Sequence, residues 1–188
     1  MILFVVTNNY YLFYGLECSL AGKINYRLQY VDPNENKKNS LIKDAGESDI
    51  VLLISEGANY TFNFLEQLCR SRVKVIYSQK LTNFPFNQIF NFIVISARFY
   101  LSDLLLAINI EQNKSHKITF PKITEMEKII LYHSARGASV SMIANYLSVS
   151  VGTVYQHQLN AFSKVGIRKA CQLPELPKNF IDYLYLRH

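Results

Sequence analysis

The chain has 188 residues, of which 49% are hydrophobic and 18% are charged, and its formal net charge is +6. This composition excludes an intrinsically disordered protein, and the length allows two small domains with their own hydrophobic cores. The ILFVV run after Met1 is too short for a membrane span, because polar Thr7, Asn8 and Asn9 soon follow it. We therefore expect neither a signal peptide nor a contact with a membrane.

The positive charge is unevenly distributed. Residues 117–173 contain seven Lys or Arg and two Glu, whereas residues 1–116 contain eleven basic and ten acidic side chains. A local basic excess is typical of a surface that neutralises phosphates, although a solvated face can also be basic.

Three cysteines, Cys18, Cys69 and Cys171, are widely separated and match no CxxC or Cys/His spacing. We interpret them as small apolar residues of a reduced, cytoplasmic protein. No metal site and no cofactor are expected.

Residues 1–110 alternate short apolar runs with helical patterns. Runs rich in Val, Ile and Tyr predict strands at residues 2–6, 26–31, 49–54, 73–77 and 92–95. Helix-spaced Leu, Phe and Ile predict helices at residues 11–20, 39–45, 61–69 and 101–110. Between residues 78 and 91, Pro85 leaves room for a short helix at most. This order predicts an α/β domain with a doubly wound parallel sheet.

The order resembles the receiver domain of bacterial response regulators, and Ile2–Leu16 is similar to that family's first strand and first helix. The family's chemical groups are missing, however. Thr7 and Asn8 replace the two Mg²⁺-binding acids, and Ile54 replaces the phosphate-accepting Asp. The Lys expected after the fifth strand falls on Ser96 or Ala97, and only Ser78 matches its family position.

Phosphoryl transfer to a carboxylate needs a nucleophilic oxygen and a divalent cation held by charged oxygen ligands. Ile54 supplies no nucleophile, and Thr7 with Asn8 supply no anionic ligand. We therefore predict a degenerate receiver-like domain that keeps the fold and has lost phosphorylation.

Aromatic residues cluster in two parts of this domain. They are Tyr10, Tyr11, Phe13 and Tyr14 near the start, and Phe84, Phe86, Phe90 and Phe92 around the fifth strand. Most are expected to fill the core. The alternative is that some of them form a dimer contact near the fourth helix and fifth strand, the side through which response regulators commonly dimerise.

A polar run at residues 111–121 ends in Pro121 and predicts a linker. Helical signals then follow. Thr124 and Glu127 form a capping-box signature, and Gly137 offers a left-handed stop. Ser139 is expected to cap a short helix whose inward residues are Met142, Ile143, Tyr146 and Leu147. Ser150 ends a tight turn and caps a helix at residues 151–165.

Residues 122–173 resemble the all-α LuxR/FixJ/NarL-type helix-turn-helix DNA-binding domain. The matching positions are Gly137, Ser139, Ile143, Ala144, Leu147, Ser150, Thr153, Val154, His157, Lys164 and Gly166. Three positions depart from the pattern, because Met142 replaces a Glu, Tyr155 replaces a frequent Lys, and Val165 replaces a Leu. The second departure should change what is read in the DNA groove.

The resemblance implies that the helix at 151–165 enters the major groove of double-stranded promoter DNA. Helical spacing directs Val154, Ala161 and Val165 to the core. On the other face we predict that Tyr155, Gln156 and Leu159 read bases, since Gln pairs with adenine edges and Leu contacts thymine methyl groups. The predicted phosphate contacts are Ser150, Thr153, His157, Asn160 and Lys164.

The last segment, residues 174–188, forms an extension. Pro174 is expected to cut the fourth helix, which begins at Arg168, and Pro177 to precede a further helix at 178–186. That helix can pack on the domain or replace the family's dimerisation helix, and the sequence leaves both open.

These features favour a cytoplasmic, phosphorylation-independent transcription regulator. It is expected to act as a homodimer or as a heterodimer with another LuxR-type regulator, as in the auxiliary regulators of capsule and fimbriae that it resembles. The alternative is an interaction module that titrates a partner regulator without binding DNA. An enzyme is not expected, because no phosphate-binding Gly-rich loop, metal cluster or nucleophile–base pair is found.

Overall fold

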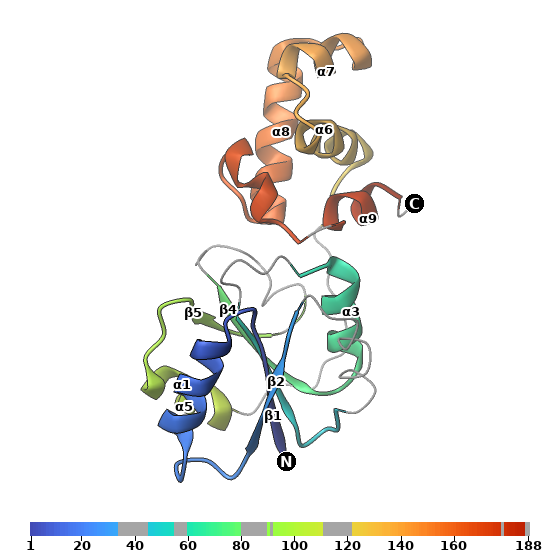
Figure 1. Cartoon of the computed structure of the whole chain (residues 1–188). Coiled ribbons are helices and arrows are strands. Elements are labelled where there is room, and N and C mark those ends of the chain that lie inside the picture. The colour runs from blue at the N-terminus through green and yellow to red at the C-terminus, as the bar shows by residue number, and fades with distance from the viewer. Residues whose placement is uncertain are drawn as a thin grey trace. The chain divides into compact units, whose positions relative to one another are not determined.

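The computed structural model describes residues 1–33, 45–54, 60–79, 90, 92–110, 122–177 and 179–186. They belong to two compact units, the first up to Ile110 and the second from Lys122 onward (Figure 1). The predicted linker at 111–121 and, apart from Ala45, the predicted helix at 39–45 lie outside the described residues. So does nearly all of the segment 78–91 that was expected to hold at most a short helix.

The first unit is built on a parallel five-stranded sheet in the order β2-β1-β3-β4-β5, as the alternating pattern predicted. This is the strand order of one common doubly wound fold. The central strands are buried on both faces, which explains their uninterrupted apolar sequences. The strands are β1 Ile2–Val6, β2 Arg27–Val31, β3 Ile50–Ile54, β4 Lys74–Gln79 and β5 Ile93–Ser96.

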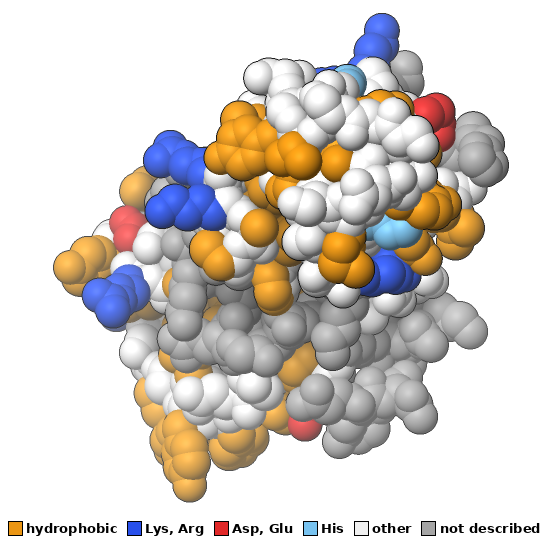
Figure 2. All heavy atoms as spheres, turned by 90° about the horizontal axis from the view of Figure 1, so that it is seen from above, with side chains coloured by type: hydrophobic (Ala, Val, Ile, Leu, Met, Phe, Trp, Pro, Cys, Tyr) orange, Lys and Arg blue, Asp and Glu red, His pale blue; other side chains and the backbone are white. Residues whose placement is uncertain are grey.

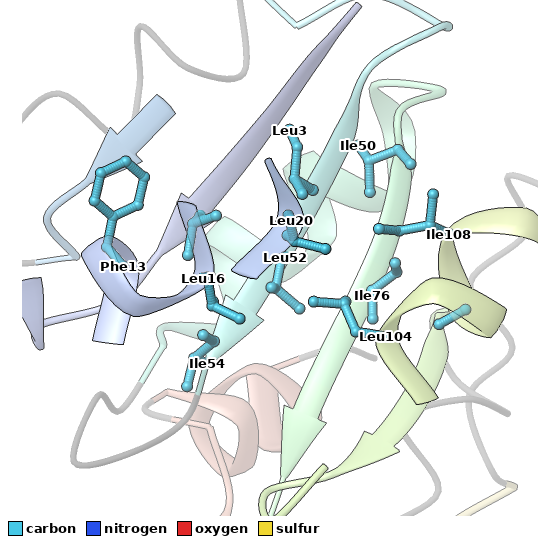
Figure 3. Close-up of a cluster of buried hydrophobic side chains, with 12 residues drawn as sticks. Leu3, Phe13, Leu16, Leu20, Ile50, Leu52, Ile54, Ile76, Leu104 and Ile108 are labelled. Atoms are coloured by element: carbon cyan, nitrogen blue, oxygen red, sulfur yellow. The ribbon is translucent and has the colours of Figure 1, made fainter. Parts of the chain in front are cut away.

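Helices α1 (Tyr10–Leu20) and α5 (Leu101–Asn109) cover one face of the sheet (Figure 1). Figure 3 shows their apolar side chains meeting those of the strands in one cluster. Helix α3 (Phe62–Arg70) lies on the opposite face, where the ring of Tyr60 just before it is 6.1 Å from that of Tyr77. The sheet is therefore covered on both sides, and functional groups are left to its edges and to the outer helix surfaces.

The aromatic residues around the fifth strand fill the core where the structure describes them, as expected for most of the aromatic residues. Phe90 and Phe92 are 1% and 4% exposed, and Phe84 and Phe86 lie outside the described residues. Large exposed rings occur on α1 instead, where Tyr11 is 87% exposed. Of the three cysteines, Cys69 is buried, whereas Cys18 and Cys171 are exposed.

The second unit is helical. Its elements are α6 Glu125–Ala135, α7 Val140–Leu147, α8 Val151–Val165, the 3₁₀ helix η1 Ala170–Glu175 and α9 Phe180–Leu186. Thr124, Ser139 and Ser150 cap the first three helices as predicted, each accepting a bond from a backbone N–H of the first turn. Gly137 follows α6 at φ +82°, a conformation that favours glycine. No helix in the described part of the chain is long and apolar enough to cross a membrane.

The inward face of α7 differs from the expected one. Ile143 and Ala144 are buried and Leu147 is half-buried, whereas Met142 and Tyr146 are 64% and 70% exposed. The helix has only two turns, and residues 143, 144 and 147 share the face that meets α6 and α8. Met142 and Tyr146, four residues apart, share the outer face.

The C-terminal extension packs on its own unit. Phe180 and Leu184 of α9 are buried against α6, and the Tyr185 ring stacks on Tyr132 at 4.1 Å. Asp182 forms an ion pair with Arg136, with 2.7 Å between Oδ1 and Nη2. The guanidinium of Arg136 also lies 3.4 Å from the centre of the Tyr132 ring. The segment before α9 also differs from the prediction: a 3₁₀ helix, η1, begins at Ala170, and Pro174 is the fifth of its six residues instead of ending a helix that begins at Arg168.

The packing of α9 can be tested with two identical substitutions on this helix. Leu184→Ala should lower the free energy of unfolding of the second unit by about 2–5 kcal/mol, because it leaves a cavity against α6. Leu186→Ala removes a side chain that is 73% exposed and should have almost no effect. Equal losses for the two variants in urea denaturation would contradict this packing.

Candidate nucleic-acid interface

Helix α8 is fixed at both ends by local signals. Ser150 Oγ accepts a 3.0 Å bond from the backbone N–H of Thr153 and lies 2.8 Å from the Thr153 hydroxyl. At the other end Gly166 adopts φ +78°, and the N–H of Ile167 returns to Phe162 O at 2.9 Å. These caps hold a 15-residue helix with a defined start, and its exposed N-terminus carries the positive end of the helix dipole.

One side of α8 is buried and holds the helix in the unit. Val154, Ala161 and Val165 are fully buried, as the spacing predicted. Gln158 is also buried, and its amide Nε2 donates to Ser134 Oγ on α6 at 2.9 Å. Apolar contact and one polar bond therefore fix the rotation of α8 about its own axis.

The opposite side of α8 is exposed and lacks charge. Tyr155 is 55% and Leu159 is 42% exposed, and Gln156 is exposed on the same side of the helix. Gln156 Nε2 donates to Asn160 Oδ1 at 3.3 Å, so the two amides orient one another. The three predicted base readers are thus brought together on one outer face.

The predicted phosphate contacts lie around this face. Ser150 and Thr153 are exposed at the N-terminus, Asn160 is exposed next to Gln156, and His157 is half-buried at the side. The groups of the N-terminal end are hydroxyls and backbone N–H groups, which suit an anion at a helix start.

Lys164 has a partner that the sequence pattern did not reveal. Its Nζ donates to both carboxylate oxygens of Glu127, at 2.8 and 2.7 Å, and the Glu127 side chain is only 4% exposed. Glu127 Oε2 also accepts from the backbone N–H of Thr124 at 2.8 Å. Burial opposes ionisation of this carboxyl, but the bonds from Lys164 and Thr124 outweigh it and lower its pKa.

Two further cations of this unit are paired, whereas Lys122, Arg168 and Lys169 are bound to no carboxylate of the described residues. Lys128 pairs with Glu125 at 2.6 Å and Arg136 with Asp182 at 2.7 Å. Arg168 and Lys169, directly after α8, are exposed and have no carboxylate partner within the described residues. The sequence analysis counted their charge without assigning them to the site, although an Arg-Lys pair just behind the Gly166 cap was a usable signal.

Figure 2 views the molecule from above, where α7 and α8 lie in Figure 1. Hydrophobic and uncharged side chains make up much of the surface seen from this side. The large apolar side chains that α7 and α8 expose are Met142, Tyr146, Val151, Tyr155 and Leu159. An uncharged, partly apolar surface of this kind can contact base edges and methyl groups.

The first unit contains the second predicted site, at the carboxyl edge of the sheet. Thr7, Ile54 and Ser78 are fully buried there, Asn8 is exposed and Ala97 is half-buried. The Ile54 side chain lies in the hydrophobic cluster beneath α1 (Figure 3). No three His, Cys, Asp or Glu side chains of the described ranges come together as a metal site.

Tyr60 closes this edge, and the sequence analysis missed it. Its hydroxyl is 2.9 Å from Val6 O and 2.8 Å from Ile54 O, the last carbonyls of β1 and β3. Tyr60 is 2% exposed, and burial raises the pKa of its hydroxyl well above the ordinary value of about 10. The sequence gives only a weak signal for this role of Tyr60, because a single Tyr before a helix can serve many structural purposes.

Replacement of Lys164 tests its pairing with Glu127. Lys164→Met should lower the free energy of unfolding of the second unit by about 1–3 kcal/mol at pH 7, because a buried carboxylate loses its cation. Folding lowers the pKa of Glu127. The stability that the ion pair contributes is therefore complete at pH values above the pKa of Glu127 in the unfolded chain. It is lost as the pH falls through the lower pKa of Glu127 in the folded chain. Lys122→Met, at an exposed position, is the control. A loss that stays constant down to pH 3 or below would contradict the pairing.

Tyr60→Phe tests the closed sheet edge. The variant should lose about 1–3 kcal/mol of stability at pH 7, because two buried carbonyl oxygens lose a donor. Folding raises the Tyr60 pKa, so the wild-type advantage is complete below the unfolded pKa and is lost as the pH rises above it. Denaturation at pH 7 and pH 11 should therefore show a smaller difference at the higher pH. An unchanged variant at pH 7 would show that the hydroxyl contributes nothing.

No protein-family model matches the sequence, and no curated protein shows significant similarity to it. Solved structures do resemble this fold. RcsB from Salmonella enterica serovar Typhimurium, bound to the promoter P1flhDC in the presence of the phosphomimetic BeF₃⁻, has a TM-score of 0.69 at 16% identity over 98% of both chains. The same protein bound to the promoter rprA gives 0.67 at 16% identity, covering 98% of this chain and 99% of that one.

A structure of two RcsB dimers bound to two parallel DNAs has a TM-score of 0.68 at 15% identity, covering 100% of this chain and 99% of that one. Similarity at this level of identity establishes the fold alone. The chain therefore shares its fold with these RcsB structures along essentially its whole length.

Proposed function

We propose that this protein is a cytoplasmic, DNA-binding transcription regulator of the LuxR type. In this proposal α7 and α8 form a helix-turn-helix, and α8 enters the major groove of promoter DNA. The observation that carries it is the outer face of α8, where Tyr155, Gln156 and Leu159 are aligned and exposed on a capped, rigidly packed helix. The shared fold with RcsB, a two-component response regulator solved in complex with DNA, supports it.

The base-reading assignment follows from chemistry and position. Gln156 can bind an adenine edge with its amide, which Asn160 orients at 3.3 Å. Leu159 offers an apolar contact to a thymine methyl group. Tyr155 stands where the family often has Lys, and it replaces a charge by a ring with a hydroxyl. This face should therefore contribute to selectivity more than to general affinity.

The phosphate contacts are assigned to the border of that face. Ser150, Thr153, His157 and Asn160 keep the role expected from the sequence, and the N-terminus of α8 adds backbone N–H groups. Arg168 and Lys169 are added because they are exposed and bound to no described carboxylate. Lys164 acts mainly through Glu127, so its effect on DNA binding is to position α8.

Control by phosphorylation is not part of this proposal. At the described carboxyl edge of the sheet, the predicted receiver positions hold Thr7, Ile54 and Ser78. The Tyr60 hydroxyl is hydrogen-bonded to the last carbonyl oxygens of β1 and β3. These groups supply neither a carboxylate nucleophile nor anionic ligands for Mg²⁺. The first unit is therefore proposed to be a degenerate receiver, and control comes from protein abundance, a partner or a ligand.

Two assemblies suit such a regulator. One is a homodimer that binds two half-sites, and the other is a heterodimer with another LuxR-type regulator, as in auxiliary regulators of surface structures such as capsule and fimbriae. A homodimer would bind two-fold related half-sites, whereas a heterodimer would bind two half-sites of different sequence.

A second function is favoured by the exposed apolar side chains of α7. Met142 and Tyr146 project from the outer face of α7, next to the half of α8 that begins at Val151. These residues fit a protein contact, and a module that titrates a partner regulator without binding DNA would use them. The exposed cations behind α8 favour the DNA reader.

Substitutions on α8 should separate base reading from phosphate contact. Gln156→Ala should change the preference at one or two base pairs, at a cost of about 1–3 kcal/mol on the preferred duplexes. Arg168→Gln and Lys169→Gln should each weaken binding to all duplexes alike. Each should also reduce the slope of log K against log salt concentration by about one, because one phosphate contact is lost. Binding profiles over a randomised duplex library measure both effects.

The control for charge is Lys23→Gln, which removes one exposed cation from the first unit. It should leave the profile and the salt slope close to those of the wild type. If Gln156→Ala and Arg168→Gln act alike on every duplex, the proposed division of the face is wrong.

Treatment with Mg²⁺ and a small phosphodonor tests the proposed loss of phosphorylation. The intact mass should remain unchanged, because Ile54 offers no carboxylate nucleophile and Thr7 and Asn8 offer no anionic ligand for Mg²⁺. A receiver domain that is known to be active, treated in parallel, verifies the donor. The mass increase of one phosphate would contradict the proposal.

A further inference from the structure

The outer face of α8 consists of two neighbouring rows, in each of which the residues are four positions apart and therefore adjacent on the helix surface. The apolar row consists of Val151, Tyr155 and Leu159. The polar row consists of Gly152, Gln156 and Asn160. The apolar side chains are 52%, 55% and 42% exposed, and the residues of the polar row are exposed as well. Leu159 follows Gln156 by three positions, so the two rows meet at these two side chains.

This face offers no charged group to a nucleic acid base. From Val151 to Ser163 the helix contains no Lys, Arg, Asp or Glu, and Lys164 is paired with Glu127. Arg and Lys are the usual partners of guanine, and Glu and Asp accept from cytosine. Gln and Asn pair with adenine, and apolar side chains contact the thymine methyl group. The two rows therefore supply partners for adenine and thymine and lack the usual partners of guanine and cytosine.

Asn160 determines which groups of the Gln156 amide remain free. Gln156 Nε2 donates one of its hydrogens to Asn160 Oδ1 at 3.3 Å, and no other side-chain hydrogen bond of these two residues occurs within the described part of the chain. One Nε2 hydrogen and the Oε1 acceptor of Gln156 are left. Adenine presents the complementary groups, since its N7 accepts and its N6 donates. Guanine presents two acceptors, N7 and O6, so its O6 would face Gln156 Oε1.

We propose that α8 recognises a site whose contacted base pairs are A·T, with adenine bound by Gln156 and a thymine methyl group packed against Leu159. Asn160 is the positioning residue that turns the Gln156 amide towards adenine and away from guanine. The Nδ2 group of Asn160 stays free to donate to a phosphate, so this role is compatible with its phosphate contact. The inference rests on the proposed function and deepens it, because it names the base pairs that the exposed face selects.

The role of Asn160 is tested with the full chain on the duplex enriched from a random library and on its single-base replacements. At the position whose preference Gln156→Ala removes, the wild type should favour adenine over guanine by about tenfold or more. Asn160→Ala should reduce this ratio to about threefold or less, because the released amide can offer both hydrogens to guanine.

Asn160→Asp is the matched control, since its carboxylate still accepts from Gln156 Nε2. It should keep the ratio of the wild type while it weakens binding to all duplexes, because the added negative charge repels phosphates. An Asn160→Ala variant that loses affinity but keeps the ratio of adenine to guanine overturns the positioning role.

The thymine contact is tested by replacing single thymines of the enriched duplex with deoxyuridine, which lacks only the methyl group. At one position the wild type should lose about fourfold in affinity, the value expected for one buried methyl group. Leu159→Ala should show no loss at that position. Leu106→Ala, the same substitution at a 65% exposed position of α5, should behave like the wild type. Equal losses for all three proteins, or no loss for the wild type, overturn the assignment of Leu159.

The selection itself separates this inference from the proposed function. A motif with A·T pairs at the positions that depend on Gln156 and Leu159 is the expected result. A motif with G·C pairs at those positions overturns the inference and leaves α8 as a DNA reader. The absence of any enriched motif overturns both.

Discussion

The second unit depends on one ion pair, between Glu127 at the start of α6 and Lys164 at the end of α8. Glu127 serves both as a capping residue for Thr124 and as the acceptor for Lys164, at 2.7 and 2.8 Å. A carboxylate that is 4% exposed cannot remain charged without such partners. The pair therefore fixes the position of α8 on α6, and α8 carries the face on which the proposed function depends.

The two units use their polar groups in opposite ways. In the first unit, the buried side chains of Tyr60 and Ile54 fill the described part of the carboxyl edge of the sheet. Tyr60 and Ile54 therefore serve packing at this edge. In the second unit, Tyr155 and Gln156 of α8 are exposed and take no part in the core. The proposed function rests on these exposed groups of α8.

Local signals allowed much of the fold to be predicted. The caps at Thr124 and Ser150 and the apolar strands depend on neighbouring residues. The caps coincide with the predicted residues, and the strand ends lie within two residues of the predicted ones. Features that depend on distant residues were not predictable. Lys164 needed the position of Glu127, 37 residues away, and Tyr60 needed the ends of two strands. For α7, a two-turn helix with apolar residues on several sides, spacing alone could not decide that Met142 points outward.

The central claim, that α8 reads DNA in a chain that needs no phosphoryl group, is tested most directly by selection from a random duplex library. The untreated full chain is used, without Mg²⁺ or a phosphodonor. We predict enrichment of one motif with two-fold related half-sites and loss of the enriched positions with Gln156→Ala. A library that shows no enrichment over its starting composition, or a requirement for prior phosphorylation, would contradict the account.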